Sequence, residues 1–179
     1  NITLDYKKMF NNHNVSILAG AEYFDISSFS MSAAGKGAAS DDIYTLNAAT
    51  ERTSISSSRS ENKIKSLFGR LNYDYKNKYL FTSVIRYDGT SVLDDSWGAF
   101  PGFSAGWNIH EEDFFKNSGL IKVISSLKPR ISYGINGNIA GIGNYEVQGG
   151  YGIQPSYNGG SSFLNTGIVN TNLHWEKSK

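Results

Sequence analysis

The stretch that decides the fold runs from residue 67 to residue 88 and reads LFGRLNYDY (67–75), KNK (76–78) and YLFTSVIRYD (79–88). In the first part, apolar or aromatic residues alternate with polar ones. The last part repeats this pattern, and a short polar corner joins the two. A period of two is typical of a β-strand whose faces differ. The sequence therefore predicts two antiparallel strands with one apolar and one polar face.

Tyrosines lie at both ends of the apolar face, at Tyr73, Tyr75, Tyr79 and Tyr87. A transmembrane β-barrel places such residues at its two membrane interfaces, where the ring contacts lipid and the hydroxyl contacts water. The pattern indicates a protein of the bacterial outer membrane.

The composition favours an all-β protein, with 39% hydrophobic and 13% aromatic residues, 19 glycines and 3 prolines among 179 residues. A net charge of +1 argues against nucleic acid as a partner, because such proteins normally carry a clustered basic face. The absence of cysteine excludes disulfides and thiolate metal sites.

The chain has no apolar run of about 18 residues, which a transmembrane helix needs, whereas a barrel strand needs only about 9 to 11 alternating residues. No charged stretch followed by an apolar one begins at Asn1. We therefore expect either that a signal peptide has been removed or, as the preferred reading, that the chain is an internal piece of a longer protein.

Six complete strands and the opening of a seventh are expected, connected by loops of unequal length. Connections after the second, fourth and sixth strands are on average longer, and long loops in bacterial barrels are extracellular. Short helical turns are expected around residues 113–115 and 120–124. The expected strands are residues 1–7, 14–24, 67–75, 79–88, 97–109 and 127–136, with a seventh from Leu173, and the long loops of little regular structure are 25–62 and 137–171.

The free energy of placing a charged side chain in lipid predicts which face of the sheet contacts the membrane. An arginine at the midplane of a barrel costs about 2 to 4 kcal/mol when it faces lipid, so the arginines of three strands are expected to face the lumen. Phe68, Leu80 and Val84 interrupt the polar face, either because they pack on something that fills the lumen or because isolated apolar residues are common on an inward face. The lumen-facing set is Arg70, Asn72, Asp74, Arg86, Asp88 and Arg130, and the lipid-facing set is Leu71, Tyr73, Tyr75, Tyr79, Phe81, Ile85, Phe103, Trp107, Ile131 and Tyr133.

Aromatic residues in the long outer loops are the candidates for contact with a ligand or a partner protein, because sugar rings stack on them and interfaces use them as anchors. The alternative is that they belong to the interfacial belt or pack within their own loops. The candidates are Tyr44, Tyr145, Tyr151 and Tyr157, with Trp97 at the rim.

Catalytic and metal-binding patterns are not found. The histidines His13, His110 and His174 lie far apart in sequence, so no metal site is expected. Acidic pairs such as Glu111 and Glu112 are adjacent, which points them apart rather than toward one bond. A Gly-x-Ser-x-Gly motif is also absent, so the sequence predicts neither an enzyme nor a cofactor.

Six segments resemble, in order and spacing, the barrel of SusC/RagA-type TonB-linked outer-membrane proteins of the Bacteroidetes. They are LFGRLNYDYKNKYL (67–80), RYDGTS (86–91), WGAFPGFSAGW (97–107), LKPRISYG (127–134), GN with IGNY (137–138 and 142–145) and NLHWEK (172–177), and the resemblance covers about residues 64–179.

The resemblance implies a 22-stranded barrel with an N-terminal plug, a SusD-like surface lipoprotein as partner, and import of oligosaccharides or peptides with energy from TonB. The chain then represents about six to seven strands of that barrel over residues 1–179 and does not contain the plug. Six strands cannot close so wide a barrel, so the chain is expected to be part of a longer protein. A soluble β-sandwich that binds carbohydrate is the alternative, and a passive porin is a third possibility.

Overall fold

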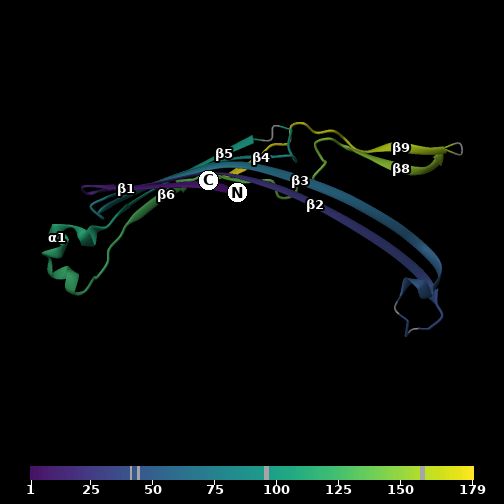
Figure 1. Cartoon of the computed structure of the whole chain (residues 1–179), viewed down its shortest axis with the longest axis horizontal. Coiled ribbons are helices and arrows are strands. Elements are labelled where there is room, and N and C mark those ends of the chain that lie inside the picture. The colour runs from purple at the N-terminus through teal and green to yellow at the C-terminus, as the bar shows by residue number, and fades with distance from the viewer. Residues whose placement is uncertain (41, 44, 95–96, 158–159) are drawn as a thin grey trace. The chain divides into compact units, whose positions relative to one another are not determined.

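The computed structural model describes residues 1–40, 42–43, 45–94, 97–157 and 160–179, without the side chains of residues 154–157 and 161. It divides into two units, Asn1–Phe24 with Lys63–Lys179, and Asp25–Asn62. None of the described helices has the length and apolar character needed to cross a membrane. The elements are β1 (Ile2–Phe10), β2 (His13–Ala38), η1 (Leu46–Ala48), β3 (Ala49–Tyr75), β4 (Tyr79–Thr90), β5 (Trp97–Trp107), η2 (Ile109–Glu111), α1 (Asp113–Lys116), η3 (Gly119–Lys122), β6 (Arg130–Gly134), β7 (Asn136–Asn138), β8 (Gly150–Tyr157), β9 (Gly160–Gly167) and β10 (Glu176–Ser178) (Figure 1).

Strands β1 to β6 form one sheet in sequential order, so each strand pairs with its neighbours in the chain. The β1–β2 and β3–β4 turns contain Asn11, Lys76 and Asn77 with φ of 53°, 55° and 55°. Tight hairpin turns favour this left-handed conformation, because its twist matches that of the strands. The turns lie side by side, since the Lys76 N–H donates to the Asn12 carbonyl at 2.8 Å. The predicted all-β antiparallel fold is confirmed.

The register keeps the alternation of the sequence on the same two faces across the sheet. Tyr73 pairs with Phe81, and Phe103 pairs with both Ser83 and Tyr133, on what we call the apolar face. Arg70 pairs with Val84 on the opposite, polar face. All ten residues predicted to face lipid lie on the apolar face, and all six predicted to face the lumen lie on the polar face.

The prediction of an irregular loop over residues 25–62 is wrong. Strand β2 continues to Ala38 and β3 begins at Ala49, so most of this segment is a two-stranded arm. Its serine-rich composition has low β-propensity, but contacts between paired strands stabilise the extended conformation. The Ser30 and Ser58 hydroxyls are 2.7 Å apart, and the Thr50 hydroxyl donates to the Gly37 carbonyl at 2.9 Å.

The C-terminal third also differs from the prediction. Strand β6 is shorter than residues 127–136, because Pro129 has no N–H to donate to a neighbouring strand. Residues 137–171 are not a single irregular loop, since β8 and β9 pair within them despite their many glycine, serine and asparagine residues. The seventh strand is present as β10, which begins at Glu176 and pairs with β7. Helical turns also form near the predicted positions, as α1 and η3.

A small packed cluster joins β5 to the last strands. The Phe100 side chain, on the polar face, is 8% exposed, and its ring meets the edge of the Trp175 ring at 5.1 Å. Gly137 of β7 lies directly against the Phe100 ring, and a Cβ at this position would overlap it. Any larger residue at position 137 would therefore require the Phe100 ring to move.

Candidate functional site: an aromatic row, a charged cluster and a polar network

Five aromatic rings form a continuous row along the end of the sheet that carries the short turns. Neighbouring ring centroids are 4.8 to 6.3 Å apart along the series. Because the turns are short and the register is regular, the apolar-face residue nearest the turn falls at the same level on each strand. We call this set the aromatic row: Phe10, His13, Tyr75, Tyr79 and Trp107.

Sequence reasoning placed neither Phe10 nor His13 in the predicted lipid-facing set, and it treated His13 as a turn residue without a metal site. Its Nδ1 lies 2.8 Å from the Tyr73 hydroxyl, and its ring contacts Phe10 and Tyr75. A signal was present, because His13 is in phase with Val15 on the apolar side of β2. Amphipathic rings at one level are typical of a membrane–water interface.

The opposite end of the apolar face also carries stacked rings. Tyr87 and Trp97 have ring centroids 4.8 Å apart and an interplanar angle of 14°. Trp97 was a candidate contact residue at the rim, and the structure places it on the apolar face beside Tyr87. Between the two ends, the side chains of Ile85, Phe103 and Ile131 remain 55%, 49% and 75% exposed. The apolar face is therefore bordered by aromatic residues at both ends.

A charged cluster on the polar face ties three strands together. The Arg86 guanidinium lies 3.1 Å from Glu22 of β2 and 2.7 Å from Asp88 of β4, and it donates to the Ser66 hydroxyl of β3 at 2.8 Å. Its guanidinium carbon is 5.9 Å from the centre of the Phe68 ring. This contact gives Phe68, which interrupts the polar pattern, a partner on its own face. Glu22 and Ser66 were not in the set of residues predicted to face the lumen.

The other residues predicted to face the lumen do not join this cluster. The Asn72 side chain accepts a hydrogen bond from Thr82 at 3.0 Å, and Asp74 accepts one from the Asn77 N–H in the β3–β4 turn at 2.7 Å. Arg70 and Arg130 are exposed on the same face. The polar face thus combines one paired arginine with two that are open to solvent.

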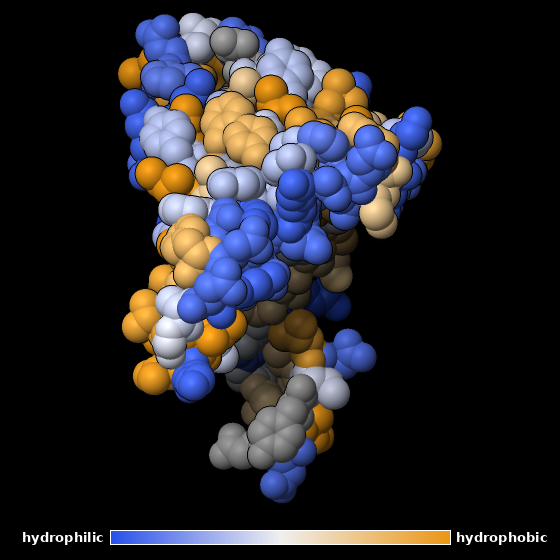
Figure 2. All heavy atoms as spheres, turned by 90° about the vertical axis from the view of Figure 1, so that its left-hand side faces the viewer, coloured by the Kyte–Doolittle hydropathy of each residue, from blue (hydrophilic) through white to orange (hydrophobic). Residues whose placement is uncertain are grey.

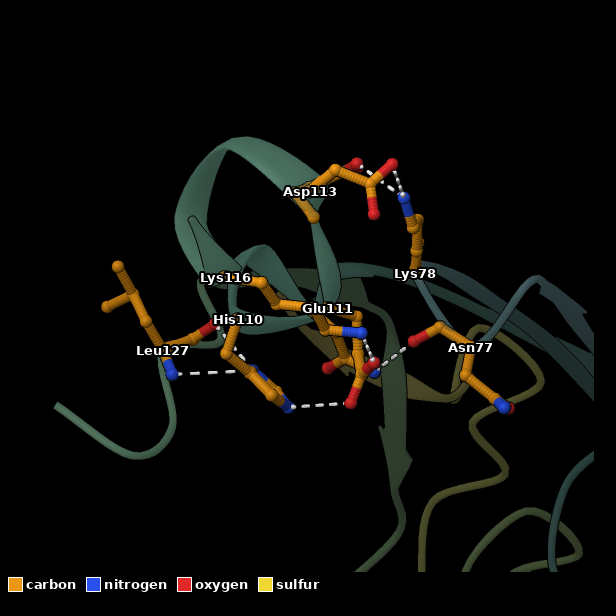
Figure 3. A network of polar contacts seen from close by, with 9 residues as sticks. Asn77, Lys78, His110, Glu111, Asp113, Lys116 and Leu127 are labelled. Atoms are coloured by element: carbon orange, nitrogen blue, oxygen red, sulfur yellow. Dashed lines mark hydrogen bonds and ion pairs between the residues drawn. The ribbon is translucent and has the colours of Figure 1, made fainter. Parts of the chain in front are cut away.

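A polar network connects the β3–β4 turn to the segment after β5 (Figure 3). The Lys78 ammonium lies 2.8 Å from Glu112 and 3.8 Å from Asp113, and Trp107 of the aromatic row donates to Glu112 at 3.0 Å. Hydrogen bonds from Lys78, Trp107 and Tyr79 lower the pKa of Glu112 to about 2. The hydrogen bond to Glu112 raises the pKa of Lys78. Figure 2 views this end of the molecule, where hydrophilic and hydrophobic residues lie side by side.

The four loop tyrosines are not brought into one site by the described residues. Tyr44 lies outside them, and so does the side chain of Tyr157. Tyr145 is half exposed and lines a shallow depression with Glu146 and Leu173, whereas Tyr151 is 75% exposed on β8 and does not line it. Among the described residues, no group of acidic or histidine side chains could hold a metal ion.

Comparisons with known proteins agree with this architecture. The chain is 35% identical over 186 residues to the TonB-dependent receptor P39 of Formosa agariphila, which covers 97% of this chain and 17% of that protein. It is 39% identical over 128 residues to the TonB-dependent receptor SusC of Bacteroides thetaiotaomicron, covering 65% of this chain and 12% of that protein. A structure of the RagAB peptide transporter superposes with a TM-score of 0.84 at 24% identity, over 98% of this chain and 20% of that one. No family model matches the chain.

The fold and the two contrasting faces define a segment of an antiparallel β-barrel. The chain belongs to the SusC/RagA-type TonB-dependent receptors. It spans about a fifth or less of the length of the relatives that it matches.

The charged cluster leads to a prediction about stability. We expect Arg86→Met in the full-length receptor to lower the free energy of unfolding by about 1 to 2 kcal/mol, because Glu22 and Asp88 lose their counter-charge. This is less than the cost of breaking a fully buried pair, since the Arg86 side chain is 43% exposed. Denaturant unfolding in detergent measures the change.

The matched control is Arg70→Met, since the described residues provide no ion-pair partner for Arg70 on the same face. We expect this variant to unfold within about 0.5 kcal/mol of the wild type. Equal losses in the two variants would show that the pairing of Arg86 contributes nothing specific.

The polar network predicts a pH dependence. Because the folded state lowers the pKa of Glu112 from 4.5 to about 2, its carboxylate stabilises the protein above about pH 5, and this contribution disappears as the pH falls toward 2. The melting temperature of the wild type should therefore exceed that of Glu112→Gln at pH 7, and the gap should close between pH 5 and pH 2.

Asp113→Asn is the control for this experiment, because the Asp113 side chain is 87% exposed and lies farther from Lys78. Its melting temperature should follow that of the wild type at every pH. A gap for Glu112→Gln that stays constant down to pH 2 would contradict the assigned pKa.

Proposed function

We propose that the chain forms part of the wall and outer loops of a TonB-dependent transporter of the outer membrane, which imports oligosaccharides or peptides with a SusD-like surface lipoprotein. The observation that carries the proposal is the exposed apolar face with aromatic residues at both ends. A face of this kind is stable in water only when something apolar covers it, and a lipid bilayer does so over its whole height.

The orientation of the faces follows from electrostatics. The apolar face, with Leu71, Tyr73 and the other residues of the predicted lipid-facing set, contacts hydrocarbon. The polar face, with Arg70, Arg86 and Arg130, lines the interior, where water or acidic partners keep the guanidinium groups solvated. The end with the short turns is periplasmic, as bacterial barrels have short periplasmic turns and longer extracellular loops. The β2–β3 arm and the β8–β9 hairpin are then extracellular.

Energy coupling and substrate belong to the whole receptor. Two relatives are named TonB-dependent receptors, which supports coupling of the whole receptor to TonB. The RagAB structure is titled a peptide transporter, which supports peptides as one substrate class beside oligosaccharides. We propose Tyr44, Tyr145, Tyr151 and Tyr157 as loop residues that contact the substrate or the lipoprotein, and we assign Trp97 to the membrane interface.

A soluble β-sandwich is the weaker alternative. In a sandwich, a second sheet covers one face of the first, so its apolar side chains are buried. Here the described strands β1 to β6 form one sheet, and Ile131 on its apolar face is 75% exposed. The relatives are receptors and a transporter, which favours a role in transport rather than in catalysis.

Uptake in the native bacterium tests the proposal. We expect the full-length protein to fractionate with the outer membrane, to migrate differently on gels with and without boiling, and to support growth on one oligosaccharide or peptide source. Deletion of the gene for TonB or for the lipoprotein should abolish this growth. Recovery of the full-length protein as a soluble periplasmic monomer would contradict the proposal.

Single substitutions test the orientation of the faces. We expect Ile131→Arg to reduce the amount of folded receptor in the outer membrane, because an arginine on the lipid side costs about 2 to 4 kcal/mol near the midplane. Ser132→Arg is the matched control, since Ser132 is the next residue and lies on the polar face. The heat-modifiable fraction in isolated membranes gives the folded amount. Tolerance of Ile131→Arg with loss of Ser132→Arg would reverse the orientation.

A further inference from the structure

The connection between β5 and β6, residues 108–129, is much longer than the two other turns at its end of the sheet. Its base is closed by hydrogen bonds, from the Ile109 N–H to the Leu127 carbonyl at 3.0 Å and from the Trp107 N–H to the Pro129 carbonyl at 3.1 Å. The His110 ring lies against Leu127 at the same point, as Figure 3 shows. The segment in between, with α1 and η3, is therefore a lobe held at a fixed place on the sheet.

This lobe exposes apolar side chains that a soluble turn would bury or lack. Phe114 is 62% exposed, Leu120 55% and Val123 85%, and Ile121 and Ile124 are also exposed. The β1–β2 and β3–β4 turns beside it contain only polar residues, Asn11 and Asn12 in one and Lys76 to Lys78 in the other. A group of exposed apolar residues confined to one turn indicates a contact with an apolar partner.

The charges of the lobe are arranged by position. Its acidic residues lie at the start, where Glu111 pairs with Lys116 at 2.7 Å and Glu112 pairs with Lys78. From residue 114 to residue 128 every charged residue is a lysine. Among the described residues, Lys122 and Lys128 have no ion pair. Apolar side chains combined with free cations are typical of segments that lie in the headgroup region of a membrane with anionic lipids.

The lobe continues the proposed membrane surface. The Phe114 ring meets the Trp107 ring at 6.4 Å with an angle of 60°, and Trp107 is the last member of the aromatic row. The lobe thus begins at the level where the apolar face ends. This ring contact joins the proposed lipid-facing surface to the first apolar residue of the lobe.

We propose that residues 113–128 form an interfacial segment that inserts Leu120, Val123 and their apolar neighbours into the headgroup region of the periplasmic leaflet. Lys122 and Lys128 bind lipid phosphates there. This inference rests on the proposed function, since it requires the sheet to span the membrane. Packing of the lobe on another part of the receptor is the competing outcome.

Site-directed spin labelling of the full-length receptor tests the inference. The 179 residues contain no cysteine, so a label at Val123→Cys is unique among them once any cysteine elsewhere in the receptor is replaced. The receptor is reconstituted in vesicles of phosphatidylcholine and phosphatidylglycerol, and collisions of the label with oxygen and with a water-soluble nickel chelate are compared. Ile131→Cys on the apolar face and Asn12→Cys in the polar β1–β2 turn are the controls.

We expect the label at position 123 to lie at a depth between the two controls, with oxygen access several-fold higher, relative to the nickel chelate, than at position 12. The inference is overturned if the label at 123 behaves like the one at 12 or if neither reagent reaches it. In that case, a label at 131 that lies deep in the bilayer still supports the proposed function. If the label at 131 is also open to the nickel chelate, the proposed function fails as well.

The role of the lysines has its own measurement. Replacing Lys122 and Lys128 with glutamine should move the label at 123 closer to water in the phosphatidylglycerol vesicles. An unchanged depth in this double variant overturns the assignment of the two lysines to lipid phosphates.

Discussion

The structure depends on backbone pairing between antiparallel neighbours in a register that keeps every strand in phase. The inner strands β2 to β5 each hydrogen-bond to a neighbour on both sides, which pairs their backbone groups within the sheet, as a membrane-spanning sheet requires. The same register sorts the side chains, because a slip of one residue would exchange the two faces. One register pairs Tyr73 with Phe81 on the apolar face and Arg70 with Val84 on the polar face.

The ends of the strands are fixed by different forces from their middles. At the short-turn end, five rings from β1, β2, β3, β4 and β5 contact one another in sequence, and Trp107 also donates a hydrogen bond to Glu112. Glu112 in turn holds Lys78 of the neighbouring turn. The aromatic row and the polar network therefore share Trp107. Ring packing at the proposed membrane interface and hydrogen bonding beside it both hold the Trp107 side chain in place.

The polar face is organised around charge compensation. Arg86 reaches Glu22, Ser66 and Asp88, which come from three adjacent strands. Such a cluster suits a wall that borders water, since a guanidinium left alone on a partly buried surface would be poorly solvated. It also accounts for Phe68, whose ring lies beside the guanidinium on a face that is otherwise polar.

The sequence alone determined the two faces, the hairpin turns and the family. The alternation between Leu67 and Asp88 is local, so it can be recognised without knowing which strands lie next to each other. The sequence did not predict the β2–β3 arm and the β8–β9 hairpin. Their serine and glycine residues give little indication of a strand, and the strands form because two segments pair. It also did not place Phe10 and His13 in the aromatic row, or Glu22 and Ser66 in the charged cluster. Only the tertiary structure decided those, since Glu22 and Arg86 are 64 residues apart and meet through strand order rather than through sequence pattern.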